Sequence, residues 1–478
     1  MRIAPCKRHF ITVCLVFAAI AWLGRGALAQ NHDTFSLALT HVTVIDGTGA
    51  APRPNQTVLL SADRIVTVGP STKVRIPNGT RTIDGGRRFL IPGLWDAHVH
   101  TRYAGIDHLR LFIATGITSV RNMSAPWEHL AEVREWRRDI EAGRRIGPRL
   151  LTAGPVFDGP GTVRQTNLTI NNAEEARDAV RRARRAGADF IKVYNLLSPE
   201  SFTAIAAEAN AQGLPFVGHV PLVIDTSAAV AAGQHTLEHI EVVALGASDR
   251  ETELRKKAAG WRPSPAVRAG PFDVREIVDS FSPEKLRSLA ALLGRMGAAL
   301  VPTLVSARNR FDPPIPPAGA QYVPAAYLDV WKQAPPSGST AADRLLYEHV
   351  EKLLRGLDAE GVTILAGTDG GTPFQVSGFS LHEELSLLVK AGLSEMKALQ
   401  AATRDPARVF HLPAQGTIEP GKRADLVLLD ANPLENIANT RKIRLVVAAG
   451  RVFDRSDLDA MLADIQKNAR EWTGTPTR

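Results

Sequence analysis

The sequence predicts an α/β protein in which a (β/α)8 TIM-like barrel over residues 89–410 carries a small β-sandwich domain formed by both chain ends. Three observations support this prediction. Strand-like and helical stretches alternate through the middle of the chain, strands and turns dominate both ends, and histidines stand at the ends of several strands. The 478 residues suffice for one large barrel and a small accessory domain.

The first 29 residues have the three parts of a secretory signal peptide. Three basic residues precede an apolar run over residues 10–23, and Ala27-Leu28-Ala29 fits a small-residue cleavage site. A membrane anchor is the weaker alternative, because the run is shorter than the roughly 20 residues that span a bilayer. We therefore expect residues 1–29 to be removed and the mature protein to be periplasmic or secreted, without membrane contact.

Removal of this segment changes the charge and the thiol content of the chain. The net charge is +8 for the whole chain, and four of its 57 basic residues but none of its 49 acidic ones lie in the segment. The mature chain is therefore only mildly basic, which gives no support for nucleic-acid binding. Cys6 and Cys14 also leave, so a transition metal would have to be held by histidine, carboxylate or modified lysine.

Both ends of the mature chain read as short strands separated by turns. Strand-like alternation covers residues 37–45, 57–60 and 64–69, and strand-like runs return over 416–430 and 443–452. Two β-rich ends around a long α/β middle predict one composite β-sandwich domain from residues 30–88 and 411–460.

Eight strand-like runs divide the middle of the chain, with helical stretches such as 199–212 and 283–296 between most of them. The runs cover residues 89–100, 117–121, 149–153, 190–194, 216–219, 235–239, 298–303 and 363–369. Eight strands with interposed helices indicate a barrel whose active site lies at the C-terminal ends of the strands. The side chains at those ends are therefore the candidates for function.

Two longer segments, residues 241–280 and 304–345, interrupt the alternation. Segments of this length in a compact domain are usually lids or binding loops. Both emerge on the face that carries the C-terminal strand ends. We expect them to form the walls that select the substrate.

The strand ends carry four histidines, a lysine and an aspartate. They are His98 and His100 on the first strand, Lys192 on the fourth, His219 on the fifth, His239 on the sixth and Asp369 on the eighth. His98 and His100 are two residues apart in a strand, so they point to the same face. A single buried histidine is more often structural than a ligand, and Lys192 alone could extend to the barrel end. Six such residues at five strand ends of one barrel indicate a metal site instead.

This order of residues resembles the amidohydrolase superfamily, specifically its binuclear subtype with a carboxylated lysine. The branch it resembles most comprises the imidazolonepropionase-like and prolidase-like secreted amidohydrolases. The resemblance covers nearly the whole mature chain and includes residues 91–100, 381–385 and 421–428.

The resemblance implies two divalent metal ions, most simply Zn²⁺, bridged by N6-carboxylated Lys192. The buried ion would be held by His98, His100 and Asp369, and the more exposed ion by His219 and His239. Asp369 would also take the proton from a metal-bridging hydroxide and return it to the leaving nitrogen. Burial of Lys192 in an apolar strand would lower its pKa, and the neutral amine is the form that takes up CO₂.

Two departures from the superfamily narrow the chemistry. Mononuclear deaminases carry a glutamate three residues after the fifth-strand histidine, where this chain has Leu222. Prolidase-like members often carry a second histidine shortly after that ligand, where this chain has Val220 and Pro221. Deamination and free dipeptides therefore lose support, and N-acyl compounds and cyclic amides stay open.

Residues near the predicted ligands are candidates for supporting roles. Tyr194 lies two residues after Lys192 and on the same face, so it would donate a hydrogen bond to the substrate carbonyl or pack as a barrel-rim tyrosine. Asp96 would hold a strand-one histidine in its metal-binding tautomer or close the barrel bottom. Arg102 and Tyr103 are weaker candidates.

The sequence thus predicts a secreted metal-dependent amidohydrolase that cleaves C–N amide bonds of small molecules such as N-acyl amino acids, small peptides or cyclic amides. A lactone, ester or phosphotriester hydrolase on the same site is the first alternative. A non-catalytic binding protein on this fold is the second. A small-molecule substrate is the expected partner, and a homo-oligomer stays open.

Overall fold

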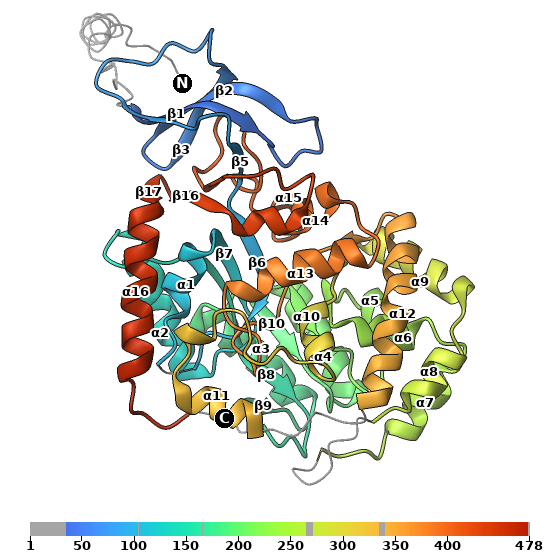
Figure 1. The fold of residues 1–478 in the computed structure, drawn as a ribbon. Coiled ribbons are helices and arrows are strands. Elements are labelled where there is room, and N and C mark those ends of the chain that lie inside the picture. Colours follow the sequence, from blue (N-terminus) through green and yellow to red (C-terminus); the bar gives the residue numbers. More distant parts are fainter. Residues whose placement is uncertain (1–34, 104, 165, 264–270, 334–339, 477–478) are drawn as a thin grey trace, which may run out of the picture.

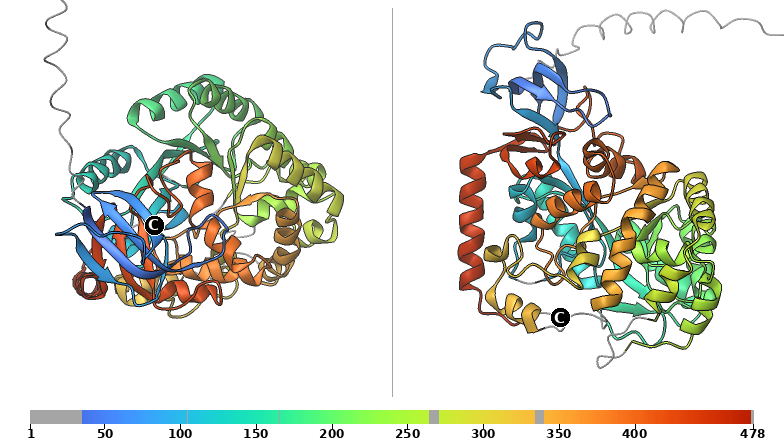
Figure 2. Two further views of the ribbon diagram at one scale, coloured as in Figure 1. Left: turned by 90° about the horizontal axis from the view of Figure 1, so that it is seen from above. Right: turned by 45° about the vertical axis from the view of Figure 1, so that its right-hand side comes forward.

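The computed structural model describes residues 35–476, apart from 104, 165, 264–270 and 334–339. The expected signal peptide, residues 1–29, lies outside the described residues. A small sheet sits at one end of a larger α/β body (Figure 1), and the views of Figure 2 show helices around the strands of that body. No helix in the described part of the chain is long and apolar enough to cross a membrane.

Strands from both chain ends share the small sheet. They are β1 (Phe35–Val44), β2 (Arg53–Ser61), β3 (Arg64–Pro70), β4 (Arg81–Asp84), β5 (Phe89–Pro92), β15 (Leu426–Leu429), β16 (Ile443–Ala448) and β17 (Arg451–Asp454). The order is β17-β16-β15-β5-β1-β2-β3, with β4 on β1. This sheet has an apolar core of its own around Leu39, Val58 and Leu428. The strands form one sheet, so the expected sandwich of two sheets is not confirmed.

The larger body is built on a parallel sheet whose strands follow one another in chain order, as expected for a TIM-like barrel. The strands are β6 (Leu94–Val99), β7 (Ile117–Asn122), β8 (Arg149–Asp158), β10 (Phe190–Val193), β11 (Phe216–Gly218), β12 (Thr236–Glu238), β13 (Ala299–Val301) and β14 (Thr363–Ile364), with β9 (Asn167–Thr169) beside β8. Residues after β14 return to β6: Ala97 N–H donates to the Ala366 carbonyl at 2.9 Å, and His100 N–H to the Gly370 carbonyl at 2.7 Å.

Helices follow most of these strands and cover the outside of the body. They are α1 (His108–Ala114), α2 (Trp127–Glu141), α3 (Ala173–Ala186), α4 (Pro199–Ala211), α5 (Thr226–Ala231), α9 (Pro283–Met296), α13 (Phe379–Lys390), α14 (Glu395–Ala401), α15 (Arg404–Val409) and α16 (Arg455–Glu471), with the short 3-10 helix η2 (Ile437–Arg441). Helix α3 shows the local logic: Asn172 caps its start by accepting from two backbone N–H groups, and left-handed Gly187 ends it.

The first predicted strand, residues 89–100, is two strands in the structure. Gly93 separates β5, which joins the small sheet, from β6, which joins the parallel sheet. A Cβ at Gly93 would lie 2.2 Å from Oγ1 of Thr118, so only glycine allows the chain to pass here. The sequence does not reveal this division, because the mostly apolar run continues across Gly93 and both strands are buried apart from Phe89, which is partly buried.

The two long segments expected as loops are largely helical. The first holds α6 (Ile240–Gly246), α7 (Glu251–Ala258) and α8 (Val274–Asp279). The second holds α10 (Leu304–Asn309), η1 (Ala320–Tyr322), α11 (Ala325–Gln333) and the start of α12 (Thr340–Ala359). Helices α7, α8 and α11 lie on the side of the barrel away from the small sheet (Figure 1), where the parallel strands end.

Candidate metal centre

All six residues singled out in the sequence line one cavity of about 200 Å³ at the C-terminal ends of the parallel strands. They are His98, His100, Lys192, His219, His239 and Asp369. His98 and Lys192 lie in β6 and β10, His100, His219 and His239 directly follow β6, β11 and β12, and Asp369 lies in the turn after β14. The placement expected from the strand order is therefore present, and the role of each residue as a ligand stays a prediction.

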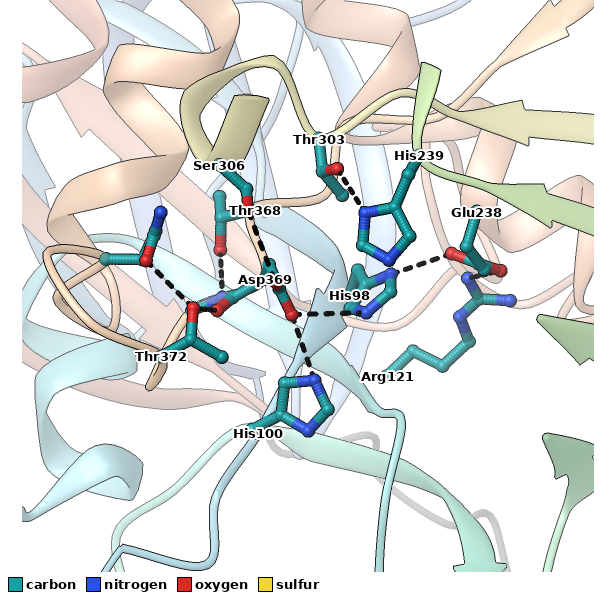
Figure 3. A network of polar contacts seen from close by, with 12 residues as sticks. His98, His100, Arg121, Glu238, His239, Thr303, Ser306, Thr368, Asp369 and Thr372 are labelled. Carbon is teal, nitrogen blue, oxygen red and sulfur yellow. Dashed lines mark hydrogen bonds and ion pairs between the residues drawn. The ribbon is translucent and has the colours of Figure 1, made fainter. Parts of the chain in front are cut away.

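Three of the six form a tight cluster (Figure 3). His98, His100 and Asp369 each offer one potential ligand atom, and these three atoms lie within 4.8 Å of one another. Nε2 of His100 is 3.0 Å, and Nε2 of His98 is 3.4 Å, from Oδ1 of Asp369. Two imidazole nitrogens and a carboxylate oxygen at such spacing can hold a divalent cation.

In three of the histidines, the ring nitrogen Nδ1 lies within hydrogen-bond distance of an oxygen atom outside the metal cavity. Nδ1 of His98 lies 2.8 Å from Oε2 of Glu238. Nδ1 of His219 lies 2.8 Å from Oδ1 of Asn195, and Nδ1 of His239 lies 2.8 Å from Oγ1 of Thr303. Such partners fix the ring orientation of a ligating histidine and leave Nε2 as the ligand atom.

Glu238 belongs to a buried charge network that sequence reasoning missed. Arg121 donates to Oε1 of Glu238 at 2.7 Å, to the Thr236 hydroxyl at 2.9 Å and to the Ala97 carbonyl at 2.6 Å. Burial would raise the pKa of Glu238, but the Arg121 guanidinium and the His98 ring hold it well below its usual range. The signal was available, because Arg121 and Glu238 each interrupt a short, otherwise uncharged strand.

Among the described residues, no hydrogen bond or ion pair joins Asp96 to a histidine ring, which corrects the first of its two expected roles. Its Oδ1 accepts from the backbone N–H groups of His98 at 3.2 Å and Thr368 at 3.1 Å, and its Oδ2 from the Thr368 hydroxyl at 2.6 Å. Asp96 therefore ties the end of the first barrel strand to the turn that presents Asp369. Burial raises its pKa to about 7.

Burial sets the protonation of the nitrogen donors. It lowers the pKa of His98 to about 4 and holds the pKa values of His219 and His239 well below the usual range, so all three rings are neutral at pH 7. It also lowers the pKa of Lys192 to about 8. Among the described residues, no hydrogen bond or ion pair engages the Lys192 side chain, which is 2 % exposed. Neutral imidazoles and a partly neutral lysine are the forms that metal binding and carbamate formation need.

Asp369 is held as an anion beside the imidazoles. Burial would raise its pKa, but His100, His98 and His239 together hold it well below the usual range. The Ser306 hydroxyl donates to its Oδ2 at 3.2 Å. Asp369 and His239 both adopt left-handed backbone angles, with φ of 61° and 70°. Non-glycine residues in this region are costly, and such costs concentrate at functional sites.

Tyr194, Arg102 and Tyr103 also line the cavity. The Tyr194 ring centroid is 4.1 Å from that of His219, and the Arg164 guanidinium lies 5.5 Å from the Tyr194 ring centroid. Arg164 and Arg310, which sequence reasoning missed, face the same cavity. Both lie in segments without strand or helix periodicity, so the sequence alone gave no reason to place them here.

Comparisons with known proteins agree with this geometry. The model of the amidohydrolase family matches residues 89–453. Ochratoxinase of Aspergillus niger is 25% identical over 459 residues, with 82% of this chain and 81% of the relative covered. A structure from Bifidobacterium longum assigned as a prolidase aligns with a TM-score of 0.65 and 26% identity, over 90% of this chain and 98% of that one. The fold also matches that of a bottromycin amidohydrolase, with a TM-score of 0.68 and 24% identity over 90% of each chain.

The family match covers most of the chain and includes every residue that lines the cavity with a metal-binding side chain. The prediction of an amidohydrolase with prolidase-like relatives is thereby confirmed. The chain belongs to the amidohydrolase family, and it is a hydrolase that acts on carbon–nitrogen bonds.

Proposed function

We propose that this protein is a secreted or periplasmic metal-dependent amidase that cleaves small-molecule amides, with N-acyl amino acids as the preferred class. One observation carries the proposal: four imidazoles, a buried lysine and a carboxylate from five barrel strands face a single cavity. A site that only bound a ligand would have no need for this donor set. The apolar run and cleavage motif at the start of the sequence support export.

The donor chemistry fits two divalent cations. We assign His98, His100 and Asp369 to one ion and, as the sequence resemblance implies, the remaining two histidines to the other, with N6-carboxylated Lys192 between them. Zinc is proposed because the donors are nitrogen and oxygen atoms and no thiolate is present among them. When bound, such ions polarise the scissile carbonyl and lower the pKa of the attacking water.

The protein's own residues supply the proton transfers. Asp369 is ionised and lies beside both strand-one histidines, so its carboxylate can accept the proton of the attacking water. The same carboxylate can then deliver this proton to the amide nitrogen as the C–N bond breaks. The Ser306 hydroxyl, 3.2 Å from Oδ2, fixes the orientation of the carboxylate during both steps. Tyr194 is the proposed hydrogen-bond donor to the substrate carbonyl.

The charge around the cavity favours an anionic substrate. Arg102 and Arg164 line it, whereas Asp369 is the single acidic side chain among the described residues of the lining. A third arginine of the lining, Arg310, is already paired with Glu241. Guanidinium groups bind carboxylates through paired hydrogen bonds. A free carboxylate next to the scissile amide, as in an N-acyl amino acid, matches this distribution better than a neutral amide does.

Turnover by the purified, zinc-loaded protein tests the proposal. We expect hydrolysis of N-acyl amino acids to exceed that of the corresponding neutral N-acyl amides, and loss of both activities after chelation. Rapid turnover of lactones or phosphotriesters without amide turnover would support the alternative hydrolase. Two bound metal ions without turnover of any of these substrates would leave the non-catalytic binding protein.

A further inference from the structure

A second and larger cavity adjoins the candidate metal centre. Its volume is about 560 Å³, against about 200 Å³ for the metal cavity. His219, His239 and Arg310 line both spaces, so the two cavities meet at the metal-binding histidines. Sites for small organic ligands usually occupy roughly 300–1,000 Å³. The metal cavity alone is too small for such a ligand, and the pair is large enough.

The second cavity, here called the apolar chamber, is lined mainly by aliphatic and aromatic side chains. They are Val220, Leu222, Val242, Leu245, Phe272, Val274, Ile277 and Leu346. The first two follow β11, and the others lie on α6, at or beside α8, and on α12. The segment 241–280, expected as a selective wall, therefore supplies most of this surface.

Most charged residues of the apolar chamber have ion-pair partners within the protein. Arg310 forms an ion pair with Glu241 and lies 3.6 Å from Asp343. Arg255 donates to Glu251 at 2.9 Å and to the Pro221 carbonyl at 3.0 Å. Because these charges are compensated within the protein, the remaining lining offers a ligand apolar contact.

Two basic side chains, Arg102 and Arg164, line the metal cavity but not the apolar chamber. Arg102 follows β6, and Arg164 lies between β8 and β9, so both belong to the first half of the barrel. The apolar chamber follows β11 and β12, which belong to the second half. A substrate that spans the site therefore meets cationic groups at one end and an apolar space at the other.

We propose that the apolar chamber is an acyl-binding subsite for medium-chain apolar acyl groups of N-acyl amino acids. The acyl chain lies in the chamber, the scissile carbonyl at the metal centre, and the amino-acid carboxylate toward Arg102 and Arg164. Water adds across the amide: the C–N bond breaks, a C–O bond forms, and a fatty acid and a free amino acid leave. The inference rests on the proposed amidase function and names its substrate class.

A chain-length series tests the subsite. We expect kcat/KM of the zinc-loaded enzyme to rise at least about 10-fold from N-acetylglycine to N-octanoylglycine, because each buried methylene adds to apolar binding. Val242 is half-buried and lines the chamber, so Val242→Trp should fill the space without disturbing the core. This variant should lose at least about 10-fold in kcat/KM for the octanoyl substrate and stay within about 2-fold for the acetyl substrate.

Val330→Trp is the matched control, because Val330 is 38% exposed on α11 and does not line the chamber. Calorimetric binding of N-octanoylglycine to the same three proteins separates the two proposals. Binding that grows with chain length and is lost only in Val242→Trp, without hydrolysis of any amide, would retain the chamber and reject the amidase. Equal turnover of both substrates, or chain-length-independent binding, would overturn the subsite.

Discussion

His98 and Glu238 face each other inside the barrel, with Nδ1 of the ring 2.8 Å from Oε2 of the carboxylate (Figure 3). Both side chains are buried, with exposed fractions of 1% and 0%. The other carboxylate oxygen accepts from Arg121. The pair therefore fixes which nitrogen of His98 carries the proton, and it does so from a position that solvent does not reach.

Glu238→Gln should weaken metal binding while the ligand set stays intact. The amide can accept from Arg121, but its NH₂ group would then face Nδ1 of His98 and favour the wrong tautomer. Loss of such a partner typically costs about 10- to 100-fold in metal affinity. Competition with a chelator measures this loss.

The matched control is Asp84→Asn, because Asp84 makes the same kind of contact with His41 on the exposed small sheet at 3.1 Å. This control should leave metal affinity unchanged. Equal affinities for wild type and Glu238→Gln would show that the pair has only a packing role.

Lys192→Ala should lower the metal content and nearly abolish activity. The side chain is buried with a pKa lowered to about 8, so the neutral amine that reacts with CO₂ becomes more abundant as pH rises toward 8. Metal uptake by the metal-free wild type in bicarbonate should therefore be greater at pH 8.5 than at pH 6.5. Elemental analysis gives the readout.

The variant should show no such pH dependence, and Lys257→Ala, at a half-exposed lysine, is the control. Two equivalents of metal and full turnover in Lys192→Ala would remove the carbamate from the mechanism. A loss of metal in Lys257→Ala as well would point to a general loss of stability.

The positions of the site residues could be predicted because residue types that bind metals lie at or near the ends of the predicted barrel strands. His98 and Asp369 stand at the end of apolar runs and Lys192 stands within one, and parallel strands end on one face of a barrel. Their convergence follows from the order of strands alone. The break at Gly93 was not predictable in this way, because it depends on the close approach of Thr118 from a neighbouring strand.

Residues whose roles depend on contacts between elements far apart in the sequence could not be predicted for the same reason. Asn195 and Thr303 reach their histidines from loops whose paths no periodicity fixes. The first role expected for Asp96 was wrong because its carboxylate accepts from the backbone N–H and the hydroxyl of Thr368, which is 272 residues away in the chain. Sequence spacing predicts which face a strand residue occupies, but it does not predict partners that other elements bring.

Tyr194→Phe should reduce catalysis without loss of metal. The substitution keeps the ring against His219 and removes only the hydroxyl proposed to bind the substrate carbonyl. Loss of one donor to a developing oxyanion typically costs about 100-fold in kcat, and KM should change little. Steady-state kinetics together with metal analysis separate the two roles expected for this residue.

Tyr322→Phe is the control, because Tyr322 stacks on Phe379 outside the metal cavity. An unchanged kcat in Tyr194→Phe, or a loss of metal with it, would assign Tyr194 to packing at the barrel rim.

Glu384 is a buried acid that holds the start of α10. It is 0% exposed, and its two oxygens accept from the backbone N–H groups of Leu304 at 3.0 Å and Val305 at 2.8 Å. Helix α10 carries Ser306, which donates to Asp369. Burial raises the pKa of Glu384 to about 8, against the lowering effect of the two backbone groups.

The raised pKa makes Glu384 a source of pH-dependent stability. Between about pH 4.3 and pH 8 the folded protein binds a proton that the unfolded chain has released, so the free energy of unfolding falls as pH rises through this window.

Glu384→Gln removes this pH-dependent contribution to the free energy of unfolding. The stability difference between wild type and variant should shrink by a few kcal/mol from pH 5 to pH 8. Urea unfolding at both pH values measures it, with exposed Glu360→Gln as control. A constant difference would mean that Glu384 ionises normally, and that the two backbone donors outweigh burial.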